Sequence, residues 1–434
     1  MTPIRIALAA ALALPTGLWL ATGFMAPAVA RSLHPLVTQY TGSMALTLMS
    51  LAMILATRPK WLEHPLNGLD KMYRLHRWLG ITSLGFMMIH WWASAGDRLR
   101  LRKGWQEETP GGLQSWLQKQ QGIAEPVGEW TFYAVVVLLA LALLRWFPYH
   151  LFQKTHRLMA VAYVFLVYHG LVLMHFAYWR QPIGWLMAAL VLAGLCAAGI
   201  ALTGRIGHKR KVTGTIESLN FYSRPQVLEC TVHLDAGWPG HKPGQFAFIT
   251  DARREGAHPY TIACDWVPEQ RRLMFLVKEL GDHTSELPGT LQEGMTVTVE
   301  GPYGCFDFED NRSRQIWIAG GIGITPFVAR MKYLAHNPGN QRRIELFFST
   351  EEYDQEAADK LIADAHAADV QLRLYYTPRD GLLTGSRIRS EVPEWREASI
   401  WFCGPAGFGH SLRRDFIAHG LRKRDFHQEL FRMR

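Results

Sequence analysis

Six apolar stretches follow one another in the first half of the chain, with polar connections between them. Each is long enough, or nearly so, to cross a hydrocarbon core of about 30 Å as a helix. The predicted spans cover residues 4–24, 40–56, 79–95, 130–147, 158–176 and 183–203. The pattern therefore predicts an all-α membrane domain over residues 1–206, a six-helix bundle whose two ends lie on the same side of the bilayer.

Short apolar runs separated by Gly and Pro replace the long stretches from about residue 207 onward. The earlier runs are typical of an antiparallel β-barrel, and the later ones alternate with helical stretches, as in an α/β domain built on a parallel sheet. The predicted strands cover residues 212–219, 227–234, 244–250, 273–279 and 295–300, then 315–319, 344–349, 371–376 and 399–403. The chain is thus expected to form three domains, 1–206, 207–312 and 313–434.

The formal net charge of +9 lies in the apolar half. Residues 1–204 hold 16 basic and 7 acidic residues, whereas residues 205–434 hold 30 of each. Nucleic acid is therefore not expected as a partner, because the predicted soluble half carries no net positive charge. The basic residues are instead expected to anchor the first half at the surface of a lipid bilayer.

The basic residues also predict the orientation of the spans, since connections rich in Lys and Arg stay in the cytoplasm. They lie between the second and third spans, between the fourth and fifth, and after the sixth: Arg58, Lys60, Lys71, Arg74, Arg77, Arg145, Lys154, Arg157, Arg205, Lys209, Arg210 and Lys211. We expect a multi-pass protein of the cell (inner) membrane with its soluble half in the cytoplasm. The connection 96–128 is an exception, because it is basic yet must lie outside.

The first apolar stretch has two interpretations. Ala28-Val29-Ala30 follows it and resembles a signal-peptidase site. The stretch is long for a signal peptide, which favours a retained helix. Cleavage would not change the orientation of the other five spans.

Four histidines lie within the predicted spans at matched spacings. His76 and His90 are 14 residues apart on the third span, and His156 and His169 are 13 residues apart on the fifth. Ionisable residues inside a membrane are costly and usually functional. Because the two spans run in the same direction, His76 is expected to pair with His156 near the cytoplasm and His90 with His169 near the outside.

Two imidazole pairs, one in each leaflet, match the axial ligands of two b haems stacked across a membrane. In the third span, the spacing falls only about 40° short of whole turns, so one helix face presents both rings about 20 Å apart. In the fifth span, the spacing passes whole turns by about 220°, so a local bulge or a tilted haem is expected. The alternative, a capping or interfacial role for each histidine, explains a single ring better than two matched pairs.

Motifs in the second predicted domain suit a flavin. In His258-Pro259-Tyr260-Thr261 the aromatic ring can cover the flavin, the hydroxyl can bond its N5 edge, and the histidine can meet the pyrophosphate. A short helix is expected to present free N–H groups to a phosphate, and the segment 301–304 is expected to form a turn that a ligand can approach. Further candidate contacts there are Gly281, Thr284, Gly301 and Gly304. Each motif alone also fits an ordinary β-turn, so their order carries the prediction.

The third predicted domain opens with a strand, a glycine loop and a helix. Glycines let the backbone approach a pyrophosphate, and the helix N-terminus supplies a favourable field. Proline suits the first turn of that helix because no N–H is needed there. The candidate contacts are Gly320, Gly321, Gly323, Thr325 and Pro326.

A later strand and the C-terminal tail complete the set of candidates. The strand delivers Cys403, Gly404 and Pro405 to the carboxyl edge of the sheet, where ligands bind in open α/β folds. Phe431 is either a packed terminal aromatic residue or a shield for the flavin where a nicotinamide docks.

Taken in order, His-Pro-Tyr-Thr, Gly-Pro-Tyr-Gly, Gly-Gly-x-Gly-x-Thr-Pro, Cys-Gly-Pro and a terminal aromatic residue resemble the ferredoxin–NADP⁺ reductase superfamily. With six spans and paired histidines ahead of them, the whole chain resembles the NADPH oxidase and ferric reductase family. The resemblance implies an oxidoreductase that moves electrons from cytosolic NADPH or NADH through FAD and two b haems to an extracytoplasmic acceptor. It assigns FAD to His258, Tyr260 and Thr261, and NAD(P)H to residues 320–326 with Cys403, while Cys403 and Phe431 shape the nicotinamide pocket.

Dioxygen, reduced to superoxide, is the first acceptor that the resemblance suggests. A ferric chelate is the alternative, attracted by the basic cluster 98–103, and a periplasmic electron acceptor protein is a third possibility. Two departures weaken the oxidase interpretation. Tyr260 stands where oxidases usually have Phe, and Ser94 stands where animal oxidases have a further His.

The choice between NADH and NADPH stays open at this level. Glu351 and Glu352 follow the predicted strand 344–349, where the ribose of the adenosine is expected, and would repel a 2′-phosphate. Nearby arginines would attract it, so the sequence favours NADH only slightly.

Overall fold

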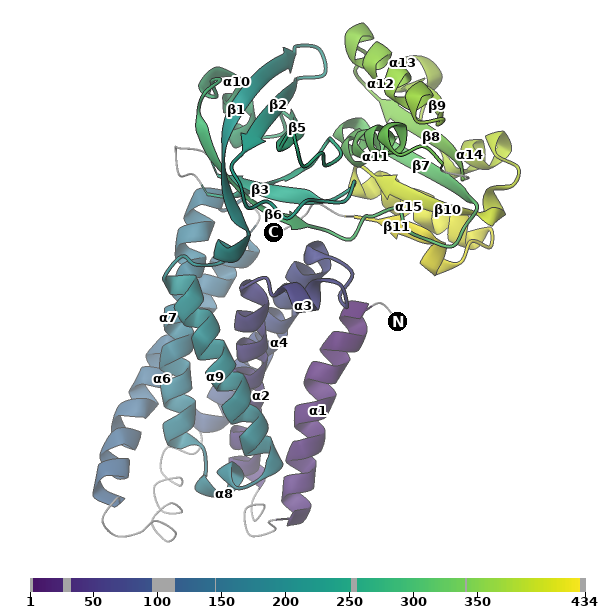
Figure 1. Ribbon diagram of the computed structural model, residues 1–434. Helices are drawn as coiled ribbons and strands as arrows, with labels where there is room; N and C mark the ends of the chain where they lie inside the picture. The colour runs from purple at the N-terminus through teal and green to yellow at the C-terminus, as the bar shows by residue number, and fades with distance from the viewer. Residues whose placement is uncertain are drawn as a thin grey trace. The chain divides into compact units, whose positions relative to one another are not determined.

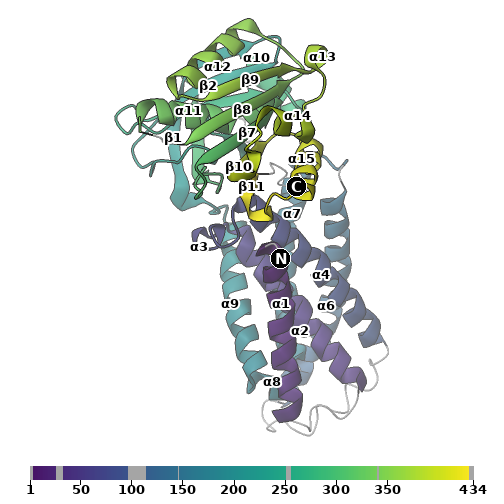
Figure 2. The same ribbon diagram turned by 90° about the vertical axis from the view of Figure 1, so that its right-hand side faces the viewer.

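The computed structural model describes residues 3–25, 33–95, 114–144, 146–250, 256–339 and 342–429. The chain divides into two compact units, of which the first ends at Ile206 and the second begins at Gly207 (Figures 1 and 2). Each unit is described below by itself.

Long helices make up the first unit. They are α1 (Pro3–Met25), α2 (Leu33–Ala56), α4 (Leu69–Ala95), α6 (Gln114–Leu143), α7 (Tyr149–Leu173) and α9 (Pro182–Leu202), with the short helices α3 (Lys60–Glu63) and α8 (Phe176–Trp179) between them (Figure 1). Each of the six predicted stretches overlaps one of the long helices, although the stretches 130–147 and 158–176 run past the ends of α6 and α7. In α6 the helix begins well before residue 130, so residues 114–128 are helical and not part of the expected external loop.

Five of the described helices are long and apolar enough to cross a membrane, and α4 is not among them. Its first turns carry Asp70, Lys71, Arg74 and Arg77, which lower its mean hydropathy. The predicted count of six spans therefore remains a prediction for this helix.

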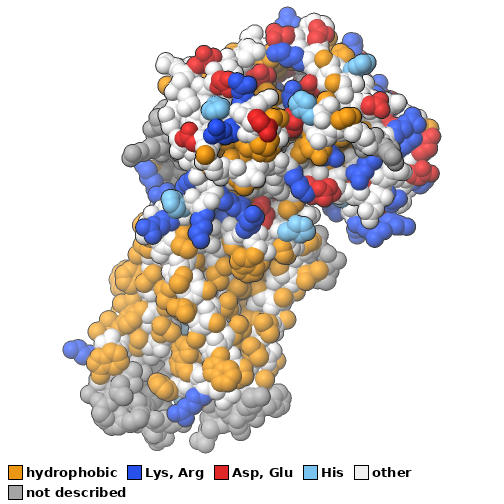
Figure 3. Space-filling model, viewed as in Figure 1, with side chains coloured by type: hydrophobic (Ala, Val, Ile, Leu, Met, Phe, Trp, Pro, Cys, Tyr) orange, Lys and Arg blue, Asp and Glu red, His pale blue; other side chains and the backbone are white. Residues whose placement is uncertain are grey.

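Helix α2 is the most buried of the apolar helices in the first unit, with 61% of its apolar window covered by neighbours. Its polar side chains bond within the bundle: Ser50 Oγ lies 2.7 Å from Tyr163 Oη, and Ser83 Oγ of α4 donates to the carbonyl of Ala45 at 2.9 Å. Hydrophobic side chains, by contrast, cover the lateral face of the bundle that Figure 3 shows. Over the first unit as a whole, Trp92, Trp130 and Leu192 are among the exposed hydrophobic residues. An apolar exterior with polar groups bonded inside suits a lipid solvent.

An antiparallel sheet opens the second unit. Its strands are β1 (Lys211–Tyr222), β2 (Val227–Leu234), β3 (Phe246–Thr250), β4 (His258–Thr261), β5 (Arg272–Lys278) and β6 (Thr296–Tyr303), in the order β4-β3-β6-β1-β2-β5. Helix α10 (Asp282–Thr290) follows β5. The two edges of the sheet meet at a single bridge between Ile262 and Phe275. Inward residues alternate along the strands, as in β2, where every second side chain is buried.

One predicted turn in this sheet was wrong. Gly301, Pro302 and Tyr303 form the end of strand β6, and only Gly304 lies beyond it. The strand continues because Tyr303 still pairs with Phe246 of β3.

A parallel sheet completes the second unit. Its strands are β7 (Arg314–Gly320), β8 (Arg343–Thr350), β9 (Gln371–Tyr376), β10 (Ala398–Cys403) and β11 (Phe426–Gln428), in the order β11-β10-β7-β8-β9. Helices α11 (Thr325–His336) and α12 (Gln355–Ala367) bury one apolar cluster against it. Helices α14 (Gly385–Glu391) and α15 (Ala406–Ala418) bury a second cluster (Figure 2). The strand order reverses at β7, the position where open α/β sheets bind ligands.

The carboxylate of Asp310 fastens the segment before β7 to two strands of the parallel sheet. Its Oδ2 accepts hydrogen bonds from Gln315 Nε2 at 3.0 Å, Ser399 Oγ at 2.5 Å and Trp401 Nε1 at 3.0 Å. Burial opposes ionisation, but the hydrogen bonds from Ser399, the Arg312 amide and Trp401 outweigh it and lower the pKa of Asp310. A carboxyl with a depressed folded pKa stabilises the fold above its unfolded pKa of about 4, and this contribution is lost as the pH falls.

We expect Asp310→Ala to lower the free energy of unfolding of the second unit by about 2–4 kcal/mol, because buried donors lose their acceptor. Thermal unfolding of the purified protein at neutral pH measures the loss. Asp310→Asn should in addition weaken the fall in stability below about pH 4. Asp307→Ala is the control, since this carboxylate accepts one loop hydrogen bond from the Glu309 amide. Equal effects of the Asp307 and Asp310 variants would contradict the anchoring role.

Candidate functional site

The structure brings the four predicted histidines together in two pairs. His76 of α4 and His156 of α7 have ring centres 5.9 Å apart, and His90 and His169 of the same two helices have ring centres 6.1 Å apart. Two imidazoles that bind one metal ion from opposite sides, with metal–nitrogen bonds of about 2.0 Å, would have ring centres roughly 6.4 Å apart. Both separations are therefore close to what axial ligation of one iron requires.

Backbone carbonyls fix the tautomer of three of these rings. The Nδ1 atoms of His76, His90 and His169 lie 2.9, 2.9 and 2.8 Å from the carbonyls of Ala52, Thr38 and Ala124. A carbonyl only accepts, so Nδ1 must carry the proton, and Nε2 keeps its lone pair for a metal. The Nδ1 atom of His156 has no hydrogen-bond partner among the described residues, and its ring stacks on Phe152 with centres 5.1 Å apart.

Two glycines make room for the outer pair, His90 and His169. Each glycine lies one helical turn after the carbonyl that its histidine contacts: Gly42 follows Thr38, and Gly128 follows Ala124. A Cβ on Gly42 would lie 3.0 Å from the ring of His90, and one on Gly128 would overlap the ring of His169. Neither glycine was among the predicted site residues.

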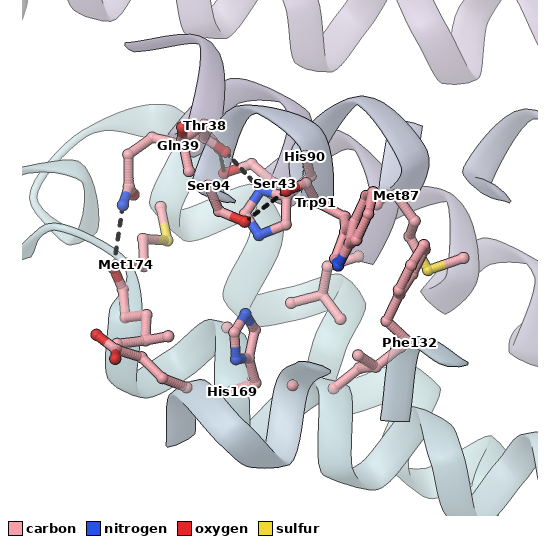
Figure 4. Close-up of a pocket in the computed structure, with 18 of the residues that line it drawn as sticks. Thr38, Gln39, Ser43, Met87, His90, Trp91, Ser94, Phe132, His169 and Met174 are labelled. Atoms are coloured by element: carbon pink, nitrogen blue, oxygen red, sulfur yellow. Dashed lines mark hydrogen bonds between the residues drawn. The ribbon is translucent and has the colours of Figure 1, made fainter. Parts of the chain in front are cut away.

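A cavity of about 380 Å³ lies between His90 and His169 (Figure 4). Its wall is mainly apolar, with Trp91, Phe132 and Leu166 among its members, and a few polar side chains such as Gln39 and Ser94 also line it. A largely apolar cavity with few polar groups, and with two imidazole rings on opposite sides, suits a flat apolar macrocycle.

Of the two adjustments expected in the fifth span, a local bulge or a tilted haem, the bulge is not present. Helix α7 is an uninterrupted α-helix from Tyr149 to Leu173. On an ideal helix, the side chains of His156 and His169 would point in directions that differ by about 140°. The ring of His169 is held by its hydrogen bond to the carbonyl of Ala124 on α6.

In the second unit, the glycine loop and the Cys403 loop meet at the carboxyl edges of adjacent strands. Ala319 of β7 pairs with Cys403 of β10, and residues Gly321–Ile324 form a 3₁₀ turn directly after β7. A Cβ on Gly323 would overlap the carbonyl of Cys403 and lie 2.8 Å from the Cα of Gly404. A Cβ on Gly320 would lie 2.9 Å from the ring of Pro405.

Two residues predicted as nucleotide contacts, Thr325 and Pro326, stabilise the glycine loop and the start of α11. Thr325 is buried, and its hydroxyl donates to the carbonyl of Ile322 at 2.7 Å. Pro326 occupies the first turn of the helix, as expected. Gly321 has a positive φ of 54°, and a Cβ there would meet nothing within 4 Å, so this backbone stays open to a ligand.

The buried carboxylate of Glu429 lies beside Cys403 and Gly304. Burial, and secondarily the negative charge of Glu429, raise the pKa of the Cys403 thiol, so it is neutral at physiological pH. A Cβ on Gly304 would lie 3.1 Å from Glu429 Oε1 and 3.2 Å from the ring of Phe246. Phe246 pairs across the sheet with Thr261, which places the predicted flavin contact beside this group. Glu429 was not among the predicted site residues.

The remaining flavin candidates lie on β4 and α10. His258 and Tyr260 share one face of β4 and line a small cavity of about 40 Å³ with Leu287 and Leu291 at α10, while Pro259 alternates to the other face. Thr284 Oγ1 accepts from the N–H groups of Leu280 and Gly281 at 2.8 and 3.2 Å. The predicted shield, Phe431, lies outside the described residues.

Comparisons with known proteins identify the class of the chain. Residues 41–167 match the family described as "Ferric reductase like transmembrane component". The chain is 25% identical to a flavohemoprotein of Burkholderia sp. (strain TH2), over 51% of this chain and 57% of that protein. It is 27% identical to respiratory burst oxidase homolog protein E of Arabidopsis thaliana, over 45% of this chain and 22% of that protein.

Two further similarities are of the same kind. Ferric reduction oxidase 8, mitochondrial, of Arabidopsis thaliana is 27% identical over 52% of this chain and 33% of that protein. The solved FAD/NAD-binding domain of nitric oxide dioxygenase from Vibrio cholerae O1 biovar El Tor is 19% identical, over 51% of this chain and 98% of that one, with a TM-score of 0.42. The chain spans between about a fifth and three fifths of the length of these curated relatives.

The chain is therefore similar to oxidoreductases, and its residues 41–167 match a family of transmembrane components. The predicted resemblance is confirmed: a ferric reductase like transmembrane domain precedes a half that is similar to flavohemoproteins, and the chain has NADPH oxidase and ferric reductase homologues.

We expect Gly323→Ala to displace the loop 403–405 and to destabilise the second unit by about 1–3 kcal/mol, because the new methyl group meets backbone atoms that cannot rotate away. Thermal unfolding measures the change. Gly407→Ala on α15 is the matched control, since a Cβ there meets nothing within 4 Å. A Gly323 variant as stable as the Gly407 variant would refute the steric argument.

Proposed function

We propose that the protein transfers electrons across a membrane from a nicotinamide dinucleotide to an acceptor on the other side. The observation that carries the proposal is the pair of histidine pairs on α4 and α7, with ring centres 5.9 and 6.1 Å apart. His76 with His156, and His90 with His169, would each hold one b haem. The carbonyls of Thr38, Ala52 and Ala124 support this role because they leave Nε2 of three rings available.

The second unit would hold the flavin and the nicotinamide. We assign residues 207–312 to FAD and residues 313–434 to NAD(P)H. A bound flavin would accept the two electrons of the hydride together and release them one at a time, and bound haems would carry single electrons. The chain would position these groups: Gly304 leaves room for Glu429, Gly323 lets the glycine loop approach the backbone of Cys403, and Cys403 would offer a neutral thiol surface. Electron transfer between them needs proximity and no acid or base.

The distribution of basic residues supports a cytoplasmic second unit. Arg58 and Lys60 at the end of α2, Lys71 at the start of α4 and Lys154 at the start of α7 all belong to connections on one side of the bundle, as does the segment after α9. Connections of this kind remain in the cytoplasm, here of a cell (inner) membrane.

Dioxygen is the acceptor that the outer cavity supports best. Glu125 and Glu129 of α6 line the cavity that also contains His90 and His169. Carboxylates there would repel an anionic ferric chelate but not a small neutral molecule. The basic cluster 98–103, which favoured the chelate, lies outside the described residues. A periplasmic acceptor protein remains the third alternative.

We expect Gly128→Ala to lower the haem-to-protein ratio by roughly half, because the methyl group displaces the ring of His169 from the outer pair. A pyridine haemochrome assay on the purified protein measures the ratio, and His90→Leu should give the same loss. Gly122→Ala on the same helix is the control, since its Cβ meets nothing within 4 Å. Full haem content in both the Gly128 and His90 variants would overturn the assignment of the outer pair.

We expect the reconstituted protein to reduce cytochrome c outside proteoliposomes when NADH or NADPH is supplied to the flavin side, and superoxide dismutase to abolish most of that signal. The physical reason is one-electron transfer to dioxygen at the outer cavity. A dismutase-insensitive signal that persists without oxygen would rule out superoxide formation. Faster reduction of ferric citrate under nitrogen would favour the chelate, and negligible turnover with both acceptors would favour a partner protein.

A further inference from the structure

A second large cavity, of about 470 Å³, lies within the second unit. Its wall includes Gly321 and Ile322 of the glycine loop, Thr350 at the end of β8, and Leu276 and Lys278 of β5. If the proposed function holds, the adenosine half of the dinucleotide occupies this cavity. The glycine loop would meet the pyrophosphate, and the segment after β8 would meet the ribose.

Every described lysine in this cavity already has a partner within the protein. Lys278 Nζ lies 2.9 Å from Glu352 Oε2, and Lys332 Nζ lies 3.4 Å from Asp364 Oδ1. Lys360 contacts Tyr222 Oη at 2.5 Å and Glu356 Oε1 at 3.2 Å. No arginine is among the described residues that line the cavity, in contrast to the arginines considered from the sequence.

The carboxylates of the wall outnumber its lysines. The acidic side chains that line the cavity are Glu229, Glu352, Asp354 and Asp364. A phosphate on the 2′-oxygen would bring up to two negative charges into this surrounding, without a free cation to meet them.

The N-terminus of helix α12 lies at the same cavity, and a side chain of the protein already caps it. Asp354 caps it, and its Oδ1 accepts a hydrogen bond from the N–H of Ala357 at 3.0 Å. A phosphate cannot use this helix end as an anion site while the carboxylate of the chain fills it.

Glu352 is held where a ribose hydroxyl is expected. Its N–H donates to Thr350 Oγ1 at 3.2 Å, and Thr350 Oγ1 donates to its carbonyl at 2.9 Å. Lys278 occupies Oε2, and within the described part of the chain Oε1 accepts no hydrogen bond. Glu351 is exposed and does not line the cavity.

We propose that this site selects NADH over NADPH, with Glu352 as the specificity-determining residue that accepts hydrogen bonds from the adenosine ribose. The inference rests on the proposed function, because it needs a dinucleotide in the cavity. Glu352 favours a free 2′-hydroxyl through Oε1 and repels a 2′-phosphate at the same atom. Asp354 adds to the repulsion.

The test compares the binding of two nucleotides that carry no hydride, ADP-ribose and 2′-phospho-ADP-ribose, to the full-length, detergent-solubilised protein. Isothermal titration calorimetry measures both affinities, and the ratio of kcat/KM for NADH and NADPH is measured alongside. We expect ADP-ribose to bind wild-type protein at least about tenfold more tightly, which corresponds to about 1.4 kcal/mol.

Three variants locate the cause. Glu352→Gln removes one charge and frees Lys278, and should lower the preference for ADP-ribose by about fivefold or more. Glu351→Gln is the matched control and should leave the preference unchanged. Asp354→Asn removes a negative charge but keeps an equally good cap on helix α12. It should therefore lower the preference for ADP-ribose through charge alone, by a smaller factor than Glu352→Gln. This variant also serves if Glu352→Gln does not fold.

The outcomes distinguish a failure of the proposed NADH specificity from a failure of the proposed nucleotide site. Equal affinities in wild type, or a preference that neither the Glu352 nor the Asp354 variant changes, would overturn the assignment of specificity while leaving the electron-transfer proposal intact. If neither nucleotide binds, both the inference and the nucleotide site in the proposed function are wrong.

Discussion

The hydrogen bond from an imidazole Nδ1 to a helix carbonyl is the interaction on which the membrane unit depends. Inside a bilayer no water satisfies a ring N–H, and three of the four paired histidines contact a carbonyl of another helix. Helix α2 supplies two such carbonyls, at Thr38 and Ala52, and α6 supplies a third at Ala124. These bonds fix which nitrogen faces the partner ring. They also explain why α2 is deeply buried and why Gly42 and Gly128 lack side chains.

The sequence was sufficient to predict the histidine pairs but not what supports them. A spacing of 14 or 13 residues within an apolar span is visible in the sequence and indicates which rings meet. A backbone carbonyl has no residue-type signal, and a glycine inside an apolar helix is common for many reasons. The bulge, one of two adjustments expected in the fifth span, is absent, and ideal helix angles do not include the hydrogen bond that holds His169 against α6.

In the second unit, local motifs predicted strands and loops well. Errors arose where pairing with a neighbouring strand determines whether a segment is a strand or a turn. The segment around Gly301 continues β6 because Glu300 and Tyr303 on either side of it pair with β3, although its sequence is typical of a turn. Strand β11 has three residues and exists because it pairs with β10. Glu429 follows it and reaches Cys403 and Gly304 only through that pairing. No local pattern connects residues 304, 403 and 429, so the sequence analysis could not find the carboxylate.

The three proposed cofactor sites differ in the charged side chains that surround them. Around His90 and His169 the wall is mainly apolar, and both of its carboxylates, Glu125 and Glu129, come from α6. At Cys403 the buried thiol is neutral, so the nicotinamide would meet little charge except that of Glu429. In the adenosine cavity, by contrast, lysines and carboxylates are paired in fixed positions. Outer-sphere electron transfer gains nothing from titratable groups, whereas recognition of a nucleotide depends on them, and the two kinds of site differ accordingly.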